Sequence, residues 1–209
     1  HVLSPYVSNY FKSDDAAADV ASYLDHGLGV TSALLFGPVE PGEEAQRPYS
    51  YVDHYRVLDE LSDGEDPYEL YRTLGHVEEV LLSRQYQFMN LSLGPDRPIE
   101  DDDVHAWTAV LDDRLSRTDT FATVAVGNGG EGDESAALNR IQVPSDCVNA
   151  ISVGAADRPD AGWRRAPYSS VGPGRSPGLM KPDLVEFGGS IERPFLVLSD
   201  SSIPLLEPT

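Results

Sequence analysis

Several kinds of feature are scarce or missing in the 209-residue sequence. Cys147 is the single cysteine, so no disulfide can form within the chain. No apolar run reaches the ~18 residues that a membrane-spanning helix needs, which predicts no membrane association. Lys and Arg number 15 against 35 Asp and Glu, giving a net charge of −20. Such a surface repels phosphate groups, so nucleic acid is excluded as a partner.

The composition is otherwise that of a globular protein. Hydrophobic residues make up 40% of the chain, and its 16 Pro and 18 Gly are spread between apolar segments. We therefore expect one compact domain over residues 1–209 with many short loops. Apolar or alternating runs predict strands, and 3.6-residue periodicity predicts helices between them. The strands are expected over 49–58, 87–93, 120–126, 148–153 and 181–187, with 195–198 as one arm of a hairpin. One helix is expected over 16–36, with a break near 25–27, and another from Val104 past Leu111. A further helix is expected over 67–83, with Asp66 as its N-cap and Pro67 as its first residue.

Alternating strands and helices predict an α/β fold. The expected architecture is a doubly wound, mostly parallel sheet with helices on both faces, in three α/β/α layers. Ligands of such folds bind beyond the carboxyl ends of the strands. Two of these ends carry polar or glycine-rich residues, at Ser92-Leu93-Gly94 and at Ala125-Val126-Gly127-Asn128.

Two residues have side chains suited to catalysis. His26, next to Gly27 at a predicted helix entrance, has the chemistry of a general base, since an unperturbed imidazole titrates near pH ~6.5. Asn128, at a strand exit, has an amide able to donate to a developing oxyanion. Taken alone, each is also typical of an ordinary residue: a surface histidine near a helix start, and a turn asparagine.

Metal ligation is not predicted from spacing. His54, His76 and His105 show no ligand pattern with one another or with Cys147. The acidic clusters at 63–66 and 100–103 do not match an EF-hand loop, and solvated charge at helix starts explains them better than calcium does.

Six short segments, taken in order, resemble the subtilisin-like (subtilase) serine peptidase family. The resemblance covers residues from about 20 to about 190, most of the chain. The segments are His26-Gly27-Leu28-Gly29-Val30-Thr31-Ser32, Tyr55-Arg56-Val57-Leu58-Asp59, Met89-Asn90-Leu91-Ser92-Leu93-Gly94, Ala125-Val126-Gly127-Asn128, Ala150-Ile151-Ser152-Val153-Gly154-Ala155 and Tyr168-Ser169-Ser170-Val171-Gly172-Pro173.

The resemblance implies a role for each matching position. His26 matches the catalytic histidine and Asn128 the oxyanion-hole asparagine. Leu28 and Gly29 depart from the family's usual Thr and second His after that histidine. Ser92, Leu93 and Gly94 match the segment that pairs with substrate backbone. Ala125, Val126 and Gly127 match a wall of the pocket for the residue before the scissile bond; the apolar character of that pocket favours a bulky apolar residue.

Two family segments have no counterpart in the sequence. The family's aspartate lies in an Asp-(Ser/Thr/Gly)-Gly segment and its serine in Gly-Thr-Ser-x-Ala, and neither is present. Ser201 and Ser202 lack that frame. We therefore expect an incomplete sheet, truncated at both ends of the domain, with the catalytic Ser and Asp outside this chain. Unpaired strand edges and an apolar trough would then favour self-association or pairing with another segment.

The resemblance implies a serine endopeptidase that works through an acyl-enzyme on a protein or peptide substrate, with this chain inactive alone. The alternatives are a non-catalytic peptide-binding scaffold derived from a subtilase and an unrelated doubly wound domain that binds a small ligand. No cofactor is required, although calcium is compatible with the family. Secretion is common in the family and a leaderless intracellular branch exists, so the compartment is left open.

Overall fold

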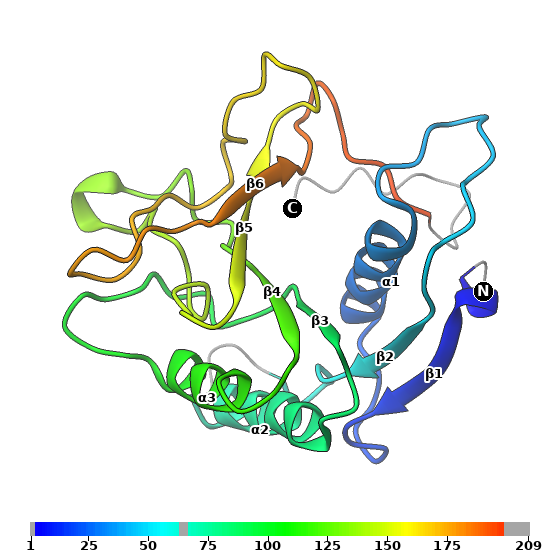
Figure 1. The fold of residues 1–209 in the computed structure, drawn as a ribbon, viewed down its shortest axis with the longest axis horizontal. Helices are drawn as coiled ribbons and strands as arrows, with labels where there is room; N and C mark the ends of the chain where they lie inside the picture. The colour runs from blue at the N-terminus through cyan, green and yellow to red at the C-terminus, as the bar shows by residue number, and fades with distance from the viewer. Residues whose placement is uncertain (1–2, 63–66, 199–209) are drawn as a thin grey trace. The chain divides into compact units, whose positions relative to one another are not determined.

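A computed structural model describes residues 3–62 and 67–198 (Figure 1). The chain divides into two compact units, residues 1–76 with 194–207 and residues 77–193 with 208–209. Helix α2 (Pro67–Ser83) contains the boundary at residue 76 and has the predicted bounds. The organisation of 1–209 as a single domain stays a prediction. The proposed helix cap at Asp66, the acidic cluster at 63–66, and Ser201 and Ser202 lie outside the described residues.

The first unit pairs two parallel strands beside a helix. After a short 3-10 turn (Ser4–Tyr6), β1 (Val7–Lys12) pairs with β2 (Val52–Arg56), and α1 (Ala21–Phe36) lies between them in sequence. Strand β1 was not predicted, because four of its six residues are exposed and its sequence lacks an apolar alternation. Residues 195–198 form no hairpin arm; instead, the backbone N–H of Leu198 donates to Ser32 Oγ, 2.8 Å away.

Helix α1 is continuous, so the predicted break near residues 25–27 is wrong. The Thr31 hydroxyl donates to the carbonyl of Gly27, 2.7 Å away, within the helix. The helix ends where Gly37 adopts a φ of 67° and its N–H donates to Ala33 O. A glycine tolerates that positive φ at no steric cost, and this fixes the end of the helix.

Arg56, at the end of β2, is a buried cation that holds the segment leading into α1. Its guanidinium donates to the carbonyls of Ala17 (3.2 Å), Ala18 (3.3 Å) and Asp14, and to the Asp19 carboxylate at 2.6 Å. The side chain is only 4% exposed. Four acceptors therefore converge on one desolvated group, which ties residues 14–19 to the strand.

Asp59 is the matching buried anion. It accepts two hydrogen bonds from Arg72, at 3.0 and 2.9 Å, and one from the N–H of Leu61. Burial alone would raise the pKa of Asp59, but these hydrogen bonds and the charges of Arg72 and Arg56 outweigh it and lower the pKa. The carboxylate thus stays ionised inside the unit.

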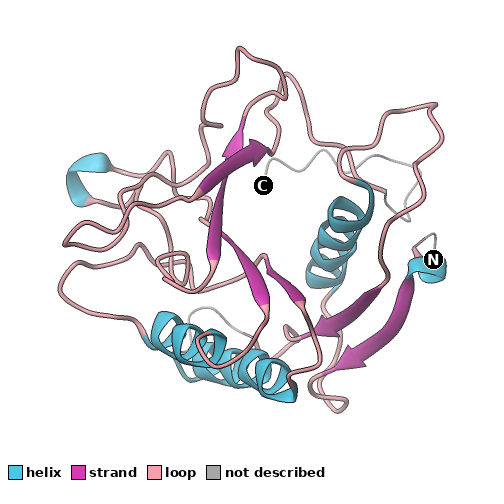
Figure 2. Cartoon of the chain, in the orientation of Figure 1, coloured by secondary structure: helices cyan, strands magenta, loops and turns pink. Residues whose placement is uncertain are grey.

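The second unit is built on a four-stranded parallel sheet (Figure 2). Its order is β3 (Phe88–Leu91), β4 (Phe121–Ala125), β5 (Ile151–Ala156) and β6 (Leu184–Phe187), with α3 (Ala106–Leu115) between β3 and β4 in sequence and a 3-10 turn (Glu134–Ala136) after β4. Every pairing in this sheet is parallel, as the alternation of strands and helices along the sequence predicted. The predicted α/β class is therefore confirmed.

The core of the second unit centres on α3. Trp107 and Leu111 are each 1% exposed, and the Thr108 hydroxyl donates to Asp146 at 2.6 Å. Cys147 is fully buried beside them, with its sulfur 3.6 Å from the carbonyl of Thr108. Burial, with the nearby charges of Asp112 and Asp146, raises the pKa of the Cys147 thiol far above its ordinary value, so the thiol is an inert part of the core.

The two faces of this sheet differ in burial. Ala122 and Val124 on one face are buried, whereas Phe88 and Phe121, paired across β3 and β4 on the other face, are 76% and 50% exposed. Their rings lie edge to face with centroids 6.0 Å apart, and Leu184 on the same face is also exposed. One face is therefore partly open to solvent in the described residues, and the incompleteness of the sheet stays a prediction. Self-association through it stays a prediction.

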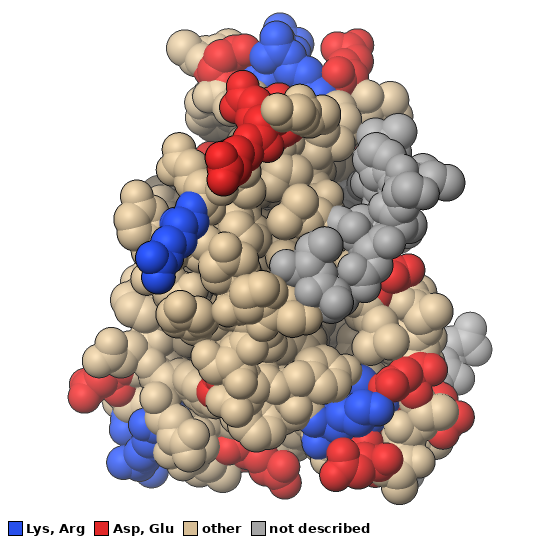
Figure 3. Space-filling view, turned by 90° about the vertical axis from the view of Figure 1, so that its right-hand side faces the viewer, with Lys and Arg blue, Asp and Glu red and all other residues tan. Residues whose placement is uncertain are grey.

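Charged side chains lie largely on the surface and pair with one another. The face drawn in Figure 3 shows Lys and Arg next to Asp and Glu, with a broad area free of either kind. Pairs such as Lys12–Asp19 and Arg193–Asp160 join the few cations to the many carboxylates. None of the described helices is long and apolar enough to cross a membrane.

Candidate active site

The two predicted substrate-binding segments, Ser92–Gly94 and Ala125–Asn128, lie at the carboxyl ends of the neighbouring strands β3 and β4. We call this end of the sheet the strand-exit edge. Leu91 of β3 is the register partner of Val124 of β4, so Ser92 and Ala125 follow directly from paired positions. Ser92 and Leu93 are half-buried, and Gly94 and Ala125 are exposed. This is the edge at which parallel sheets bind their ligands.

Val126 does not share this exposure. Its side chain is 2% exposed and packs in the core, while Gly127 is half-buried and Asn128 exposed. The backbone of Val126 is engaged as well: its N–H donates to Val153 O at 3.2 Å, and its carbonyl accepts from the N–H of Gln142 at 2.8 Å.

Asn128 stands at the start of a firmly held turn. The N–H of Gly129 donates to Ser170 Oγ at 2.9 Å, and the N–H of Gly130 donates to Tyr168 O at 2.8 Å. The backbone N–H of Asn128 itself donates to Gln142 Oε1, 3.1 Å away. The exposed carboxamide of Asn128 is therefore presented from a fixed backbone, the arrangement that an oxyanion donor requires.

Gln142 and Asp96 were missed by the sequence reasoning. Gln142 comes 14 residues after Asn128, and Asp96 lies 46 residues before Gln142. Their meeting depends on long-range packing, and no local pattern in the sequence marks it. They place a carboxamide and a carboxylate next to the predicted substrate-binding segment at Ala125–Asn128.

His26 lies in the first unit, in the second turn of α1 rather than at the helix entrance, and its side chain is exposed. Behind it, α1 contacts β2 through His54. A Cβ placed on Gly27 would lie 3.0 Å from Cε1 of His54, so the absence of a side chain at Gly27 allows the close approach of strand and helix. This contact packs the part of α1 that carries His26 against β2.

His54 is held in one orientation by its neighbours. Its ring stacks on Tyr10 with centroids 5.5 Å apart, and Nδ1 lies 3.0 Å from Thr31 Oγ1. Because the Thr31 hydroxyl proton is directed to Gly27 O, the Nδ1–H of His54 is the donor in this contact. Burial lowers the pKa of His54 from its ordinary value of 6.5.

This shift predicts acid sensitivity of the first unit. In the unfolded chain His54 takes up a proton near pH ~6.5, whereas in the fold it stays neutral to lower pH. Stability from His54 is therefore full above pH ~6.5 and falls as the pH drops below it. In urea unfolding followed by circular dichroism, the loss between about pH 7 and pH 5 should be smaller in His54→Gln than in the wild type. Equal losses would contradict this assignment.

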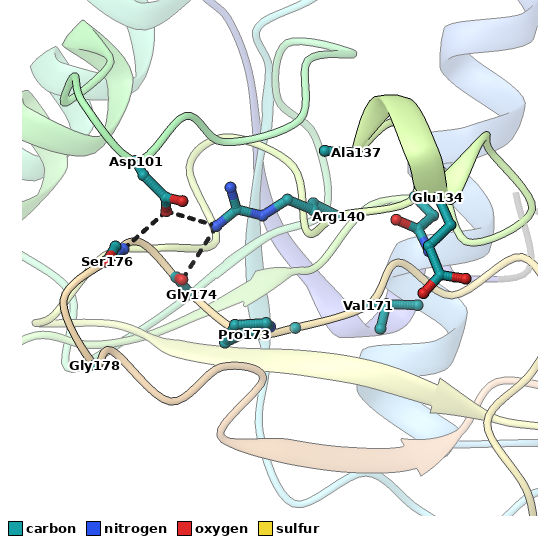
Figure 4. Close-up of a pocket in the computed structure, with 11 residues that line it drawn as sticks. Asp101, Glu134, Ala137, Arg140, Val171, Pro173, Gly174, Ser176 and Gly178 are labelled. Atoms are coloured by element: carbon teal, nitrogen blue, oxygen red, sulfur yellow. Dashed lines mark hydrogen bonds and ion pairs between the residues drawn. The ribbon is translucent and has the colours of Figure 1, made fainter.

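Within the acidic cluster at 100–103, Asp101 is engaged with protein groups. Asp101 accepts from Arg140 at 2.9 Å and from the N–H of Ser176 at 2.9 Å, and the same arginine donates to Gly174 O (Figure 4). These residues line a pocket of about 460 Å³, which includes none of the predicted site residues. Among the described residues no group of three or more His, Cys, Asp or Glu side chains could hold a metal ion. A calcium requirement stays an untested expectation.

The model of the subtilase family, Peptidase_S8, matches residues 4–205. The chain belongs to the subtilase family. A search of curated proteins found no match.

Solved structures similar to this subtilase include two proteases. The prenylagaramide maturation protease PagA is 17% identical, with a TM-score of 0.50 over 79% of this chain and 51% of its own. The epidermin leader peptide processing serine protease EpiP from Staphylococcus aureus is 19% identical, with a TM-score of 0.47 over 69% of this chain and 36% of its own. The subtilase thus spans about half or less of the length of these structures, and the likeness to PagA supports the fold.

Proposed function

We propose that this chain forms the central part of a subtilisin-type serine endopeptidase acting on protein or peptide substrates. The observation that carries the proposal is the side-by-side exit of Ser92–Gly94 and Ala125–Asn128 from paired strands, in a chain of the subtilase family. An extended peptide that binds beside these two segments gains backbone hydrogen bonds in the manner of an added strand.

Each site residue then has one task. His26 takes the proton from the nucleophilic serine and later returns it to the leaving amine. The carboxamide of Asn128 donates to the oxyanion of the tetrahedral intermediate. Ser92, Leu93 and Gly94 bind substrate backbone, and Ala125 and Gly127, with the buried Val126 between them, form one wall of the pocket for the residue before the scissile bond. Gly-Thr-Ser-x-Ala is absent from the 209 residues, so the proposal places the nucleophile and the triad aspartate outside them.

A fluorophosphonate probe tests this function, since it labels a serine only where a base activates it. In the full-length gene product we expect stoichiometric labelling of one serine, located by peptide mass outside residues 1–209. The 209-residue chain alone should not be labelled, nor should the heat-denatured full-length protein. An unlabelled but folded full-length protein would refute the peptidase function, and a label on a serine within residues 1–209 would refute the division of the triad.

The second candidate is a peptide-binding scaffold without catalysis. It is favoured by the absence of both the serine and the aspartate segments while the strand-exit segments remain. It predicts peptide binding by the full-length protein together with no fluorophosphonate label.

A further inference from the structure

The segment around Gln142 lies between the loops that follow β3 and β4. The N–H of Gln142 donates to Val126 O at 2.8 Å, on the β4 side. The N–H of Val143 donates to Arg97 O at 3.0 Å, on the β3 side. Backbone hydrogen bonds to both loops therefore fix Gln142 between the two proposed substrate-binding segments.

The side chain of Gln142 is tied at both ends of its carboxamide. Oε1 accepts from the backbone N–H of Asn128 at 3.1 Å, and Nε2 donates to a carboxylate oxygen of Asp96 in a short contact. A hydrogen bond to an ionised group is worth more than a neutral one. These two solvent-exposed hydrogen bonds hold the carboxamide between Asn128 and Asp96.

The carboxamide also lies directly on the backbone of the β4 loop. Gly127 has a φ of 92°, and a Cβ at this position would overlap Oε1 of Gln142 and lie 2.5 Å from its Cδ. A Cβ on Gly129 would lie 3.3 Å from Nε2. The volume that a glycine leaves open at residue 127 is therefore already filled by Gln142.

We propose that Gln142 is a specificity-determining residue that restricts the residue before the scissile bond to a small side chain. The inference rests on the proposed function of the strand-exit edge as a peptide-binding site. A large side chain placed against Gly127 has to displace the carboxamide of Gln142, which breaks its hydrogen bonds to the Asn128 N–H and to Asp96. Glycine, alanine or serine fits beside it. This specificity is opposite to the preference for a bulky apolar residue expected from the sequence.

The test measures binding rather than turnover. The probes are fluorescein-labelled tetrapeptide amides, Ala-Ala-Ala-Ala and Ala-Ala-Ala-Phe, titrated by fluorescence anisotropy against the full-length gene product. For the wild type we expect the Ala peptide to bind at least tenfold more tightly than the Phe peptide. In Gln142→Ala the Kd of the Phe peptide should fall at least tenfold, while that of the Ala peptide changes less than threefold. Gln85→Ala, at an exposed glutamine outside the site, is the matched control and should behave as the wild type.

Each other outcome overturns the inference: equal binding of the two peptides by the wild type, no selective gain for Phe in Gln142→Ala, or no binding of either peptide to folded protein. Circular dichroism confirms that each variant is folded. Because the readout does not need a nucleophile, an unlabelled protein that binds the Ala peptide selectively would refute the peptidase function and still support the role of Gln142.

Discussion

If the full-length gene product is the proposed peptidase, alanine in place of His26 is expected to abolish its activity. Without the imidazole no group takes the serine proton or protonates the leaving amine. In a subtilisin, removal of the triad histidine lowers kcat by about 10⁶, and a loss of many orders of magnitude is expected here for the same reason. Because His26 is exposed on α1, the substitution should leave the fold intact. The measurement is kcat on a peptide amide substrate together with circular dichroism.

The matched control is His105→Asn. His105 caps α3, where its Nδ1 accepts from the N–H of Trp107 at 3.3 Å, and an asparagine side chain preserves an acceptor at a cap. This variant loses an imidazole outside the proposed site and should retain activity within about twofold of the wild type. Activity of His26→Ala above about 1% of the wild type would show that His26 is not the catalytic base, since general base catalysis contributes at least about 10².

Methionine in place of Arg56 should destabilise the first unit by about 3–5 kcal/mol. The substitution keeps much of the apolar stem but leaves the buried carbonyl of Ala17 and the part-buried carbonyl of Ala18 without their donor. It also removes the cation opposite Asp19 and Asp59. Hydrogen exchange of peptides from α1 measures this change locally. Protection of those peptides should fall by a factor of about 10² to 10³, since ~1.4 kcal/mol corresponds to tenfold.

Arg117→Met is the control for this effect. Arg117 pairs with Asp113 one helical turn away, but its side chain is 63% exposed. Exposed pairs contribute about 0–1 kcal/mol, so the exchange of every peptide should be nearly unchanged. If Arg56→Met also changed the free energy of unfolding by less than about 1 kcal/mol, the converging acceptors would not be a stabilising network.

The sequence predicted most of the strands and helices because their apolar periodicity is strong. Helix α2 and strands β3 and β4 were found within about two residues, since each combines an apolar stripe or run with a clear stop such as Gly94-Pro95. Strand β1 was missed because its side chains are mostly exposed and polar. The break in α1 was predicted near Asp25-His26-Gly27, but Gly27 lies within the helix and packs against His54.

The sequence predicted only those parts of the candidate site that consist of consecutive residues. The strand exits at Ser92–Gly94 and Ala125–Asn128 are local consequences of strands that end in glycine. By contrast, the pairing of Gln142 with Asp96, and of Arg56 with residues 14–19, joins segments 37 to 46 positions apart. A single sequence carries no signal for such contacts, since they are set by how the loops pack. The contacts of Gln142 with Asn128 and Asp96 could therefore not be predicted from the sequence.

The burial of Cys147 has a practical consequence. The second unit contains one thiol, fully enclosed and kept protonated, and a reagent in solution reaches it only when the core around α3 opens. Both tryptophans, Trp107 and Trp163, belong to the same unit. The reactivity of the Cys147 thiol and the fluorescence of the two tryptophans therefore both report on the second unit. Opening of the second unit can be timed by thiol modification while hydrogen exchange follows the first, with no engineered label in either.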